Sequence, residues 1–157
     1  MSQVYIAGPM RGYPDFNFPA FFAAEEKLNA DGHTTFNPAR RDIEAHGPGV
    51  NNSPTGDLAD VPEFDLRDAL GADCAWICTN ATAIYMLEGW AQSKGAIAER
   101  ALGQALGLDV RYQNLLTEYE MTEEVQAAVD EAERVAWDDG YGDGYGQGCD
   151  DTEASAQ

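Results

Sequence analysis

The sequence predicts an α/β protein in which helices cover both faces of an open, parallel β-sheet. Three observations lead to this prediction: short apolar segments alternate with segments of helical periodicity, the first such group has the length of a β-α-β unit, and glycine or proline ends several of the segments. A right-handed crossover in each unit makes neighbouring strands parallel. The expected architecture is a three-layer sandwich, Rossmann-like or flavodoxin-like, followed by a C-terminal helix and an acidic tail.

The first β-α-β unit lies at the N-terminus. Its strands are predicted over residues 4–7 and 33–36, and its helix over residues 20–30. Asn17 is expected to cap the helix, and Gly32 suits the position that follows its last turn.

The middle of the chain is predicted to continue the alternation after a long interruption. Residues 39–62 are rich in Gly, Pro, Asn and Asp, which predicts an irregular loop that is either a functional lid or disordered. Apolar spacing then predicts a helix over residues 64–78, a strand over 83–87, a helix over 95–106 and a strand over 108–112.

The C-terminal part has a different composition. An amphipathic helix is predicted over residues 122–137, and the acidic, Gly-rich segment 138–157 is expected to be disordered. The length suits one domain with a substantial core, so we expect one α/β domain over residues 1–137 and a tail over 138–157.

The net charge limits the classes of partner. The 157 residues have a formal net charge of −19, and the part from Thr117 onward contains 13 acidic residues and one basic residue, Arg134. An acidic surface repels the phosphates of nucleic acids and anionic lipids, so we expect neither nucleic acid nor membrane as a partner. A small anionic ligand is compatible with this charge, because one or two cations can dominate a pocket.

Other compositional features favour a cytoplasmic protein without a metal. No apolar run reaches the roughly 18 residues that span a bilayer, and nothing at the N-terminus indicates secretion. The cysteines, Cys74, Cys78 and Cys149, are odd in number and are expected to be thiols in a reducing compartment. His33 and His46 lack ligand-like companions, so no metal or cofactor is predicted.

The turn after the first strand contains the first candidate binding residues, Gly8-Pro9-Met10-Arg11-Gly12. Glycines let backbone N–H groups approach an anion, and an arginine can bind a phosphate with two nitrogens. The turn matches neither a Walker loop nor the Gly-x-Gly-x-x-Gly pattern. It is equally compatible with an ordinary α/β turn that exposes an arginine.

The helix after the third predicted strand contains the second group, in Ser93-Lys94-Gly95-Ala96-Ile97-Ala98-Glu99. Small residues around Glu99 allow a ligand to approach the helix. The alternatives are that Glu99 only complements the helix dipole and that Ser93 only caps the helix. In parallel sheets both turns lie at the carboxyl ends of the strands, so the two groups are expected to face one pocket.

Asp73 and Trp90 are further candidates. Asp73 falls in an apolar helical stripe with Leu66, Leu70 and Ile77, where a carboxylate is costly unless it is paired or functional. An ion pair at the helix end is the alternative. Trp90 is expected either to stack on a nucleobase or to pack in the core.

Taken together, these residues resemble the nucleoside 2-deoxyribosyltransferase superfamily, over about residues 4–110. The closest resemblance is to its deoxynucleoside 5′-monophosphate N-glycosidase branch and to small phage-type relatives. Three motifs are similar to those of the branch: Tyr5-x-x-Gly8-x-x-Arg11-Gly12 to its opening Tyr-x-x-Gly-Ser-x-Arg-Gly, Asp73-x-x-Trp76-Ile77 to its Asp-Leu-x-Trp-Leu helix, and the spacing of Ser93 and Glu99 to that of its phosphate-binding serine and catalytic glutamate.

The resemblance implies cleavage of an N-glycosidic bond with retention. Glu99 is expected to attack C1′ and form a glycosyl ester as the base departs, while Asp73 delivers a proton or orients the glutamate and Tyr5 hydrogen-bonds the glutamate or the sugar. The residues expected to bind the substrate and its 5′-phosphate are Gly8, Pro9, Met10, Arg11, Gly12, Ser93, Gly95 and Trp90.

Arg11 together with Ser93 favours a phosphorylated substrate over a free nucleoside, and two departures from the family pattern bear on the choice among three functions. Pro9 replaces the serine of the branch and removes one phosphate hydrogen bond, and residues 88–92 lack the extra aspartate of the true transferases. The predicted function is hydrolysis of a (deoxy)nucleoside 5′-monophosphate. The alternatives are base exchange by a deoxyribosyltransferase and a non-catalytic nucleotide-binding module. The resemblance also implies a homodimer or higher homo-oligomer, in the host cytoplasm if the protein is phage-encoded.

Overall fold

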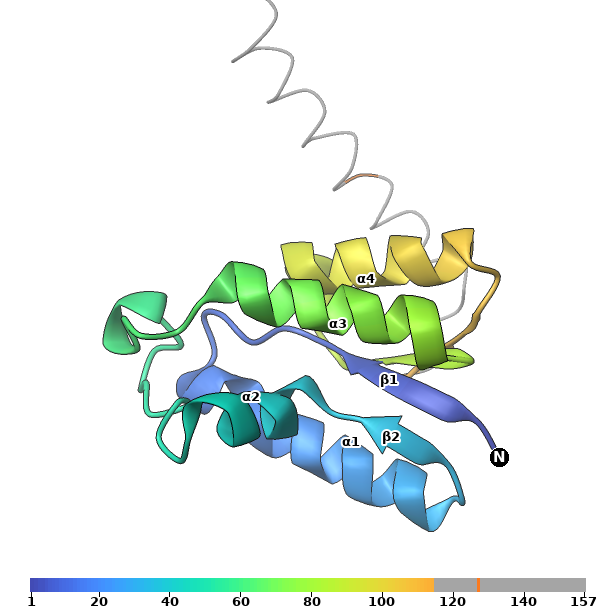
Figure 1. The fold of residues 1–157 in the computed structure, drawn as a ribbon, viewed down its shortest axis with the longest axis horizontal. Coiled ribbons are helices and arrows are strands. Elements are labelled where there is room, and N and C mark those ends of the chain that lie inside the picture. The colour runs from blue at the N-terminus through green and yellow to red at the C-terminus, as the bar shows by residue number, and fades with distance from the viewer. Residues whose placement is uncertain (115–126, 128–157) are drawn as a thin grey trace, which may run out of the picture. The chain divides into compact units, whose positions relative to one another are not determined.

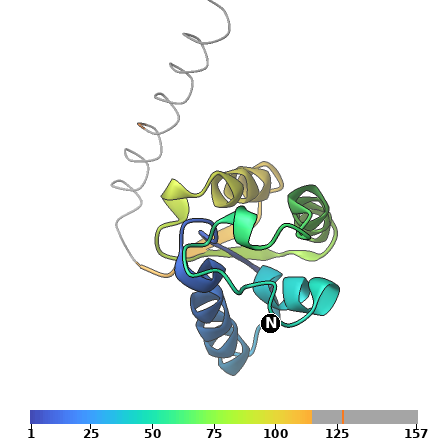
Figure 2. The same ribbon diagram turned by 90° about the vertical axis from the view of Figure 1, so that its left-hand side faces the viewer.

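The computed structural model describes residues 1–114 and Ala127, and it contains a parallel β-sheet with helices on both faces (Figures 1 and 2). Within these residues the sheet has four strands in the order β2-β1-β3-β4, and every pairing is parallel. The strands are β1 (Gln3–Ala7), β2 (Thr34–Phe36), β3 (Ala83–Met86) and β4 (Asp109–Tyr112). The predicted α/β class and parallel sheet are therefore confirmed.

The helices form the two outer layers. In Figure 2, α3 and α4 lie above the sheet and α1 lies below it, while α2 runs beside β2. The α-helices are α1 (Phe18–Ala30), α2 (Pro38–His46), α3 (Leu66–Asn80) and α4 (Lys94–Ala105), and the short 3₁₀ turns are η1 (Pro14–Asn17), η2 (Leu58–Asp60) and η3 (Trp90–Gln92). None of the helices in the described part of the chain is long and apolar enough to cross a membrane.

The strand order places a crevice between β1 and β3. From β1 the chain crosses to β2 on one side, and from β3 it crosses to β4 on the other. The connections therefore diverge at the carboxyl ends of β1 and β3, which is where open α/β sheets bind ligands. Both central strands are completely covered: residues 4–7 and 83–86 are all buried.

The prediction of an irregular loop over residues 39–62 is wrong at its start, because α2 occupies residues 38–46. The side chain of Asn37 accepts a hydrogen bond from the backbone N–H of Ala39, and Pro38 occupies the first turn. These two residues form a standard helix start. Residues 47–65, which follow α2, contain no further α-helix and connect it to α3.

Asn17 occupies the N-cap position of α1, but the prediction that its side chain caps the helix is wrong. Asn17 has a φ of 60°, and its Nδ2 donates to the carbonyl of Pro9 at 2.9 Å instead of capping α1. Asp15 and Phe16, with φ values of 53° and 49°, share this left-handed conformation, which costs about 1–3 kcal/mol per residue. Gly32 follows the C-cap residue of α1 with a φ of +84°, as predicted.

The predicted C-terminal elements are not described by the structure. Apart from Ala127, the helix expected over residues 122–137 and the tail expected over 138–157 lie outside the described residues.

Two helical glycines predict opposite effects of the same substitution. A Cβ on Gly103 in α4 would collide with the buried side chain of Ile84, whereas a Cβ on Gly71 in α3 would have no atom within 4 Å. We expect Gly103→Ala to lower the free energy of unfolding by about 1–3 kcal/mol, and Gly71→Ala to raise it by up to about 1 kcal/mol. Urea denaturation measures both changes, and equal effects of the two variants would contradict the packing described for α4.

Candidate active site

A cavity of about 110 Å³ lies at the carboxyl ends of β1 and β3. It brings together residues from all three motifs of the sequence analysis. Tyr5, Asp73 and Glu99 line it, and so do Gly8, Met10, Arg11, Ser93 and Gly95. The expectation that the turns after the first and third strands face one pocket is therefore correct.

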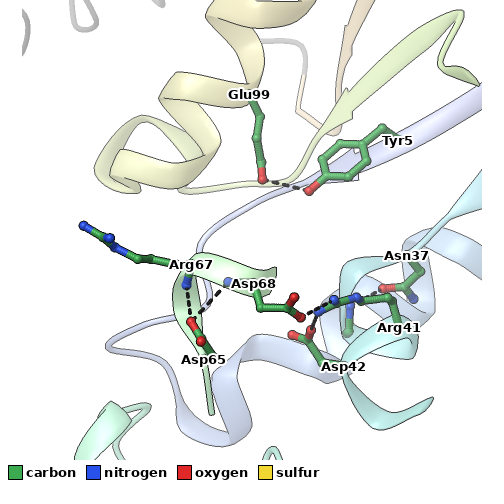
Figure 3. Close-up of polar contacts among 9 residues, drawn as sticks. Tyr5, Asn37, Arg41, Asp42, Asp65, Arg67, Asp68 and Glu99 are labelled. Atoms are coloured by element: carbon green, nitrogen blue, oxygen red, sulfur yellow. Dashed lines mark hydrogen bonds and ion pairs between the residues drawn. The ribbon is translucent and has the colours of Figure 1, made fainter. Parts of the chain in front are cut away.

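The centre of the cavity is a hydrogen bond between two buried side chains. The Tyr5 hydroxyl donates to Oε1 of Glu99 at 2.7 Å (Figure 3). Tyr5 is 0% exposed and Glu99 is 7% exposed. Helix α4 turns Ala96, Glu99 and Gly103 toward the interior, which is the spacing of one helical face. The glutamate therefore points to the sheet rather than to solvent.

Two aromatic side chains fix the Tyr5 ring. The Phe36 ring stacks on Tyr5 with 5.6 Å between the ring centroids, and Trp76 stacks on Phe36 at 4.8 Å. Because a packed ring cannot swing away, the Tyr5 hydroxyl stays directed at Glu99.

Asp73 supplies a second buried carboxyl group. It is 8% exposed on α3, and its Oδ1 is buried without a hydrogen-bond partner in the described part of the protein. An unsatisfied buried acceptor costs about 1–3 kcal/mol. Of the two readings of Asp73 considered from the sequence, a functional group explains this cost, whereas no ion pair to Asp73 is found among the described residues.

Burial favours the protonated forms of both acids. Desolvation raises the pKa of Glu99 to about 8. The hydrogen bond from Tyr5 opposes this upward shift, and the charge of Asp73 adds to it. Desolvation and the charge of Asp42 raise the pKa of Asp73 to about 7, opposed by Arg41 and Tyr5. The pKa of Tyr5 lies well above its usual value because of burial and the two carboxylates, so Tyr5 remains a donor. Near neutral pH the two carboxyl groups therefore share protons.

Helix α2 contributes a third carboxylate that the sequence analysis missed. Asp42 is 4% exposed and lines the cavity, and its Oδ1 accepts a hydrogen bond from Arg41 at 3.2 Å. Arg41 also donates to Oδ2 of Asp68 on α3 at 2.8 Å. The available signal was Asn37-Pro38, since a helix starting there places Pro38 and Asp42 one turn apart on the same face.

The candidate anion-binding groups lie at the start of α4 and in the β1 turn. Oγ of Ser93 accepts from the backbone N–H of Ala96 at 3.3 Å, which leaves its hydroxyl proton available to a ligand. Gly95 is open to the cavity, because the nearest atom to an added Cβ is Oγ of Ser93 at 3.9 Å. Arg11 is exposed and supplies a cation to the cavity.

Three predicted site residues do not line the cavity. Pro9 is buried, and the backbone N–H of Gly12 donates to the carbonyl of Gly56 at 3.1 Å. Trp90 packs against Tyr112 with 5.8 Å between ring centroids, and the guanidinium of Arg100 lies over the Trp90 ring. Trp90 thus fits the core-packing alternative of the sequence analysis.

Gly8 lines the cavity but has a second role in packing. A Cβ at this position would lie 2.8 Å from the Cβ of Leu87, which is too close for any side chain. The glycine therefore allows the ends of β1 and β3 to approach each other.

The remaining wall of the cavity is apolar. It consists of aromatic residues from η1 and α1, aliphatic and aromatic residues from the segment between α2 and α3, and the first residue of α3. These are Phe16, Phe18, Phe21, Val50, Leu58, Val61, Phe64 and Leu66. Such an apolar surface suits a flat ring. In the described residues, no three His, Cys, Asp or Glu side chains are grouped closely enough to hold a metal ion.

The raised pKa of Glu99 predicts a dependence of stability on pH. Between the usual pKa of 4.5 and the folded value of about 8, the folded protein binds more protons than the unfolded chain, so stability falls as pH rises. We expect Glu99→Gln to be more stable than the wild type at pH 8 by on the order of a few kcal/mol, and similar to it below pH 4.5. Thermal unfolding of both proteins between pH 4.5 and pH 8 tests this difference in stability, with the exposed Glu26→Gln variant as a control. Parallel profiles for Glu99→Gln and wild type would contradict a buried, proton-sharing Glu99.

Comparison with known proteins identifies the family. The family model described as "Domain of unknown function (DUF4406)" matches residues 2–112. No curated protein and no solved structure matches the chain. The matched region contains all four strands and every residue that lines the cavity. Because the match covers well over half of the 157 residues, the chain belongs to the DUF4406 family.

Proposed function

We propose that this protein cleaves the N-glycosidic bond of a (deoxy)nucleoside 5′-monophosphate, with retention, through a glycosyl ester on Glu99. The observation that supports it best is the 2.7 Å hydrogen bond from Tyr5 to Glu99, inside a cavity that Asp73 and Arg11 also line. Two buried carboxyl groups with a cation nearby suit a phosphorylated sugar whose anomeric carbon gains positive charge.

The geometry suggests a role for each oxygen in the first step. Tyr5 holds Oε1 of Glu99, so Oε2 attacks C1′. The bond from C1′ to Oε2 forms as the bond from C1′ to the base nitrogen breaks, and the electron pair leaves with the base. Protonated Asp73 donates its proton to the departing base and becomes a carboxylate.

The second step restores the enzyme. A water molecule attacks C1′ of the ester, and the bond between C1′ and Oε2 breaks. Asp73 accepts a proton from this water and regains its acidic form, while Glu99 leaves as a carboxylate. The products are the free base and the sugar 5-phosphate. If a second base replaces water in this step, the same residues perform base exchange.

The proposed mechanism requires one proton on the pair, with Asp73 protonated and Glu99 ionised. In the unliganded protein burial raises the pKa of Glu99 to about 8 and that of Asp73 to about 7, so Glu99 holds a proton more strongly than Asp73 does. The Tyr5 hydrogen bond favours the ionised form of Glu99, because it lowers the pKa that burial raises. Oδ1 of Asp73 is buried and has no hydrogen-bond partner among the described residues. Because burial raises the pKa of Asp73 to about 7, this carboxyl group can carry the proton that a general acid donates at neutral pH.

The deciding experiment is release of base from nucleoside 5′-monophosphates and from the free nucleosides, measured by chromatography. We expect the wild type to release base from a monophosphate and Glu99→Gln to lose at least about 10³-fold of the rate. Exposed Glu26→Gln is the matched control and should retain activity.

Other results of this assay favour other functions. Base exchange upon addition of a second free base, without hydrolysis, would identify a transferase. Binding of a monophosphate without release of base would indicate a nucleotide-binding module. Unchanged turnover by Glu99→Gln would overturn the mechanism.

Phosphate recognition is tested separately with two arginine variants. Arg11 lines the cavity, whereas Arg67 is exposed at the start of α3 and lies outside the cavity lining. Loss of a charge-assisted hydrogen bond costs about 1.5–3 kcal/mol, so Arg11→Gln should raise the KM for a monophosphate by about 10- to 100-fold. Arg67→Gln should leave KM near the wild-type value. Equal effects of the two variants would exclude Arg11 as the phosphate ligand.

A further inference from the structure

Asp42 is a buried, ionisable group in the cavity that the proposed mechanism does not use. It is 4% exposed and lines the cavity from α2. No catalytic step above needs a third carboxylate, and the ion pair with Arg41 offsets part of the cost of burying this one. Because Asp42 lines the cavity, the role to consider for it is recognition of the ligand.

The topology places Asp42 on the opposite side of β1 from Ser93 and Gly95. Ser93 and Gly95 follow β3, and Arg11 follows β1, whereas α2 follows the edge strand β2. Tyr5 lies on β1, which separates β2 from β3. A ligand with its phosphate near Arg11 and Ser93 and its C1′ near Glu99 therefore extends its base toward α2. Figure 3 shows Glu99 on one side of this space and Asp42 on the other.

The contacts of Asp42 define what it can bind. Burial raises the pKa of Asp42 above its usual value, and the hydrogen bond that Arg41 donates to Oδ1 at 3.2 Å opposes this shift and favours the ionised form. Asp68 accepts from Arg41 on the other side at 2.8 Å. Arg41 is not among the residues that line the cavity. The ligand therefore meets the carboxylate and not its counter-ion. Among the described residues Oδ2 of Asp42 has no hydrogen-bond partner, and Asp42 lines the cavity.

An ionised carboxylate accepts hydrogen bonds and cannot donate them. Its best partner is an edge with two adjacent N–H donors. Guanine presents N1–H beside its 2-amino group, whereas adenine and cytosine place an amino group beside an acceptor nitrogen, and thymine flanks its N–H with carbonyls. An acceptor opposite a buried carboxylate is repelled, which provides discrimination against these bases.

We propose that Asp42 recognises the nucleobase by accepting hydrogen bonds from the N1–H and 2-amino groups of guanine. The preferred ligand is then a guanine nucleoside 5′-monophosphate. This inference rests on the proposed function for the orientation of the ligand, and it adds the class of base. Recognition of a donor pair by a buried acceptor gives large selectivity, because a mismatched base leaves buried polar groups unpaired.

Binding to the Glu99→Gln protein tests the inference without depending on turnover. Calorimetric titration with dGMP, dIMP, dAMP, dCMP and dTMP measures the five affinities. We expect dGMP to bind most tightly. Because dIMP lacks only the 2-amino group, it should bind about tenfold or more weakly. Equal affinities for dGMP and dIMP, or tightest binding of another base, would overturn the inference.

A pair of isosteric variants then assigns the selectivity to Asp42. In the Glu99→Gln background, Asp42→Asn replaces one acceptor with a donor, so dGMP should bind about 10- to 100-fold more weakly while dAMP or dCMP gains relative to it. Asp68→Asn removes the same charge from the exposed partner of Arg41 and should change dGMP affinity less than about fivefold.

The outcomes separate this inference from the proposed function. Preferential binding of dGMP that is lost in Asp42→Asn, with no base released by the wild type, supports the inference and overturns the glycosidase. Release of base from several monophosphates at similar rates supports the glycosidase and overturns the inference. If Asp42→Asn fails to fold, as judged by circular dichroism, the comparison of dGMP with dIMP decides.

Discussion

The burial of a carboxyl group against the centre of the sheet is the constraint on which the rest of this structure depends. Glu99 reaches the carboxyl end of β1 because α4 places it one turn below the buried Ala96, and Tyr5 meets it from the strand. Neither group tolerates this position alone, since an unpaired buried polar atom costs about 1–3 kcal/mol. The stacked rings of Phe36 and Trp76 hold the tyrosine, so the apolar core and the polar site stabilise one geometry.

Helix α2 links this centre to the outer layers. On its outer side, Arg40 donates to both carboxylate oxygens of Glu25 on α1, at 2.8 and 2.6 Å, and Asn37 donates to the same carboxylate at 3.2 Å. On its inner side, Asp42 faces the cavity and Arg41 bridges to α3. The helix is thus fixed from two sides, which gives Asp42 the rigid support that a selective contact requires.

The β1 turn is held in a strained conformation by the segment that follows α2. Ser53 is completely buried, and its carbonyl accepts from the backbone N–H of the left-handed Asp15 at 2.8 Å. Gly12 donates to the carbonyl of Gly56 in the same segment. The turn that presents Arg11 and the apolar wall opposite it are therefore one structural unit, and the strain at residues 15–17 directs Phe16 into the core cluster.

The sequence by itself determined the α/β class, the strands and the three helices α1, α3 and α4, because apolar periodicity and turn residues act over a few neighbouring positions. It also indicated Asp73, as an acid in an apolar helical stripe, and Glu99, as an acid among small residues, whereas a role for Tyr5 followed only from the family resemblance. Helix α2 was missed because Asn37-Pro38 ends a strand and starts a helix equally well, and that choice depends on the contact of α2 with Glu25 on α1. Only the tertiary structure decided that Trp90 packs away from the cavity and that Asp42 enters it, because long-range packing selects which face of each segment is buried.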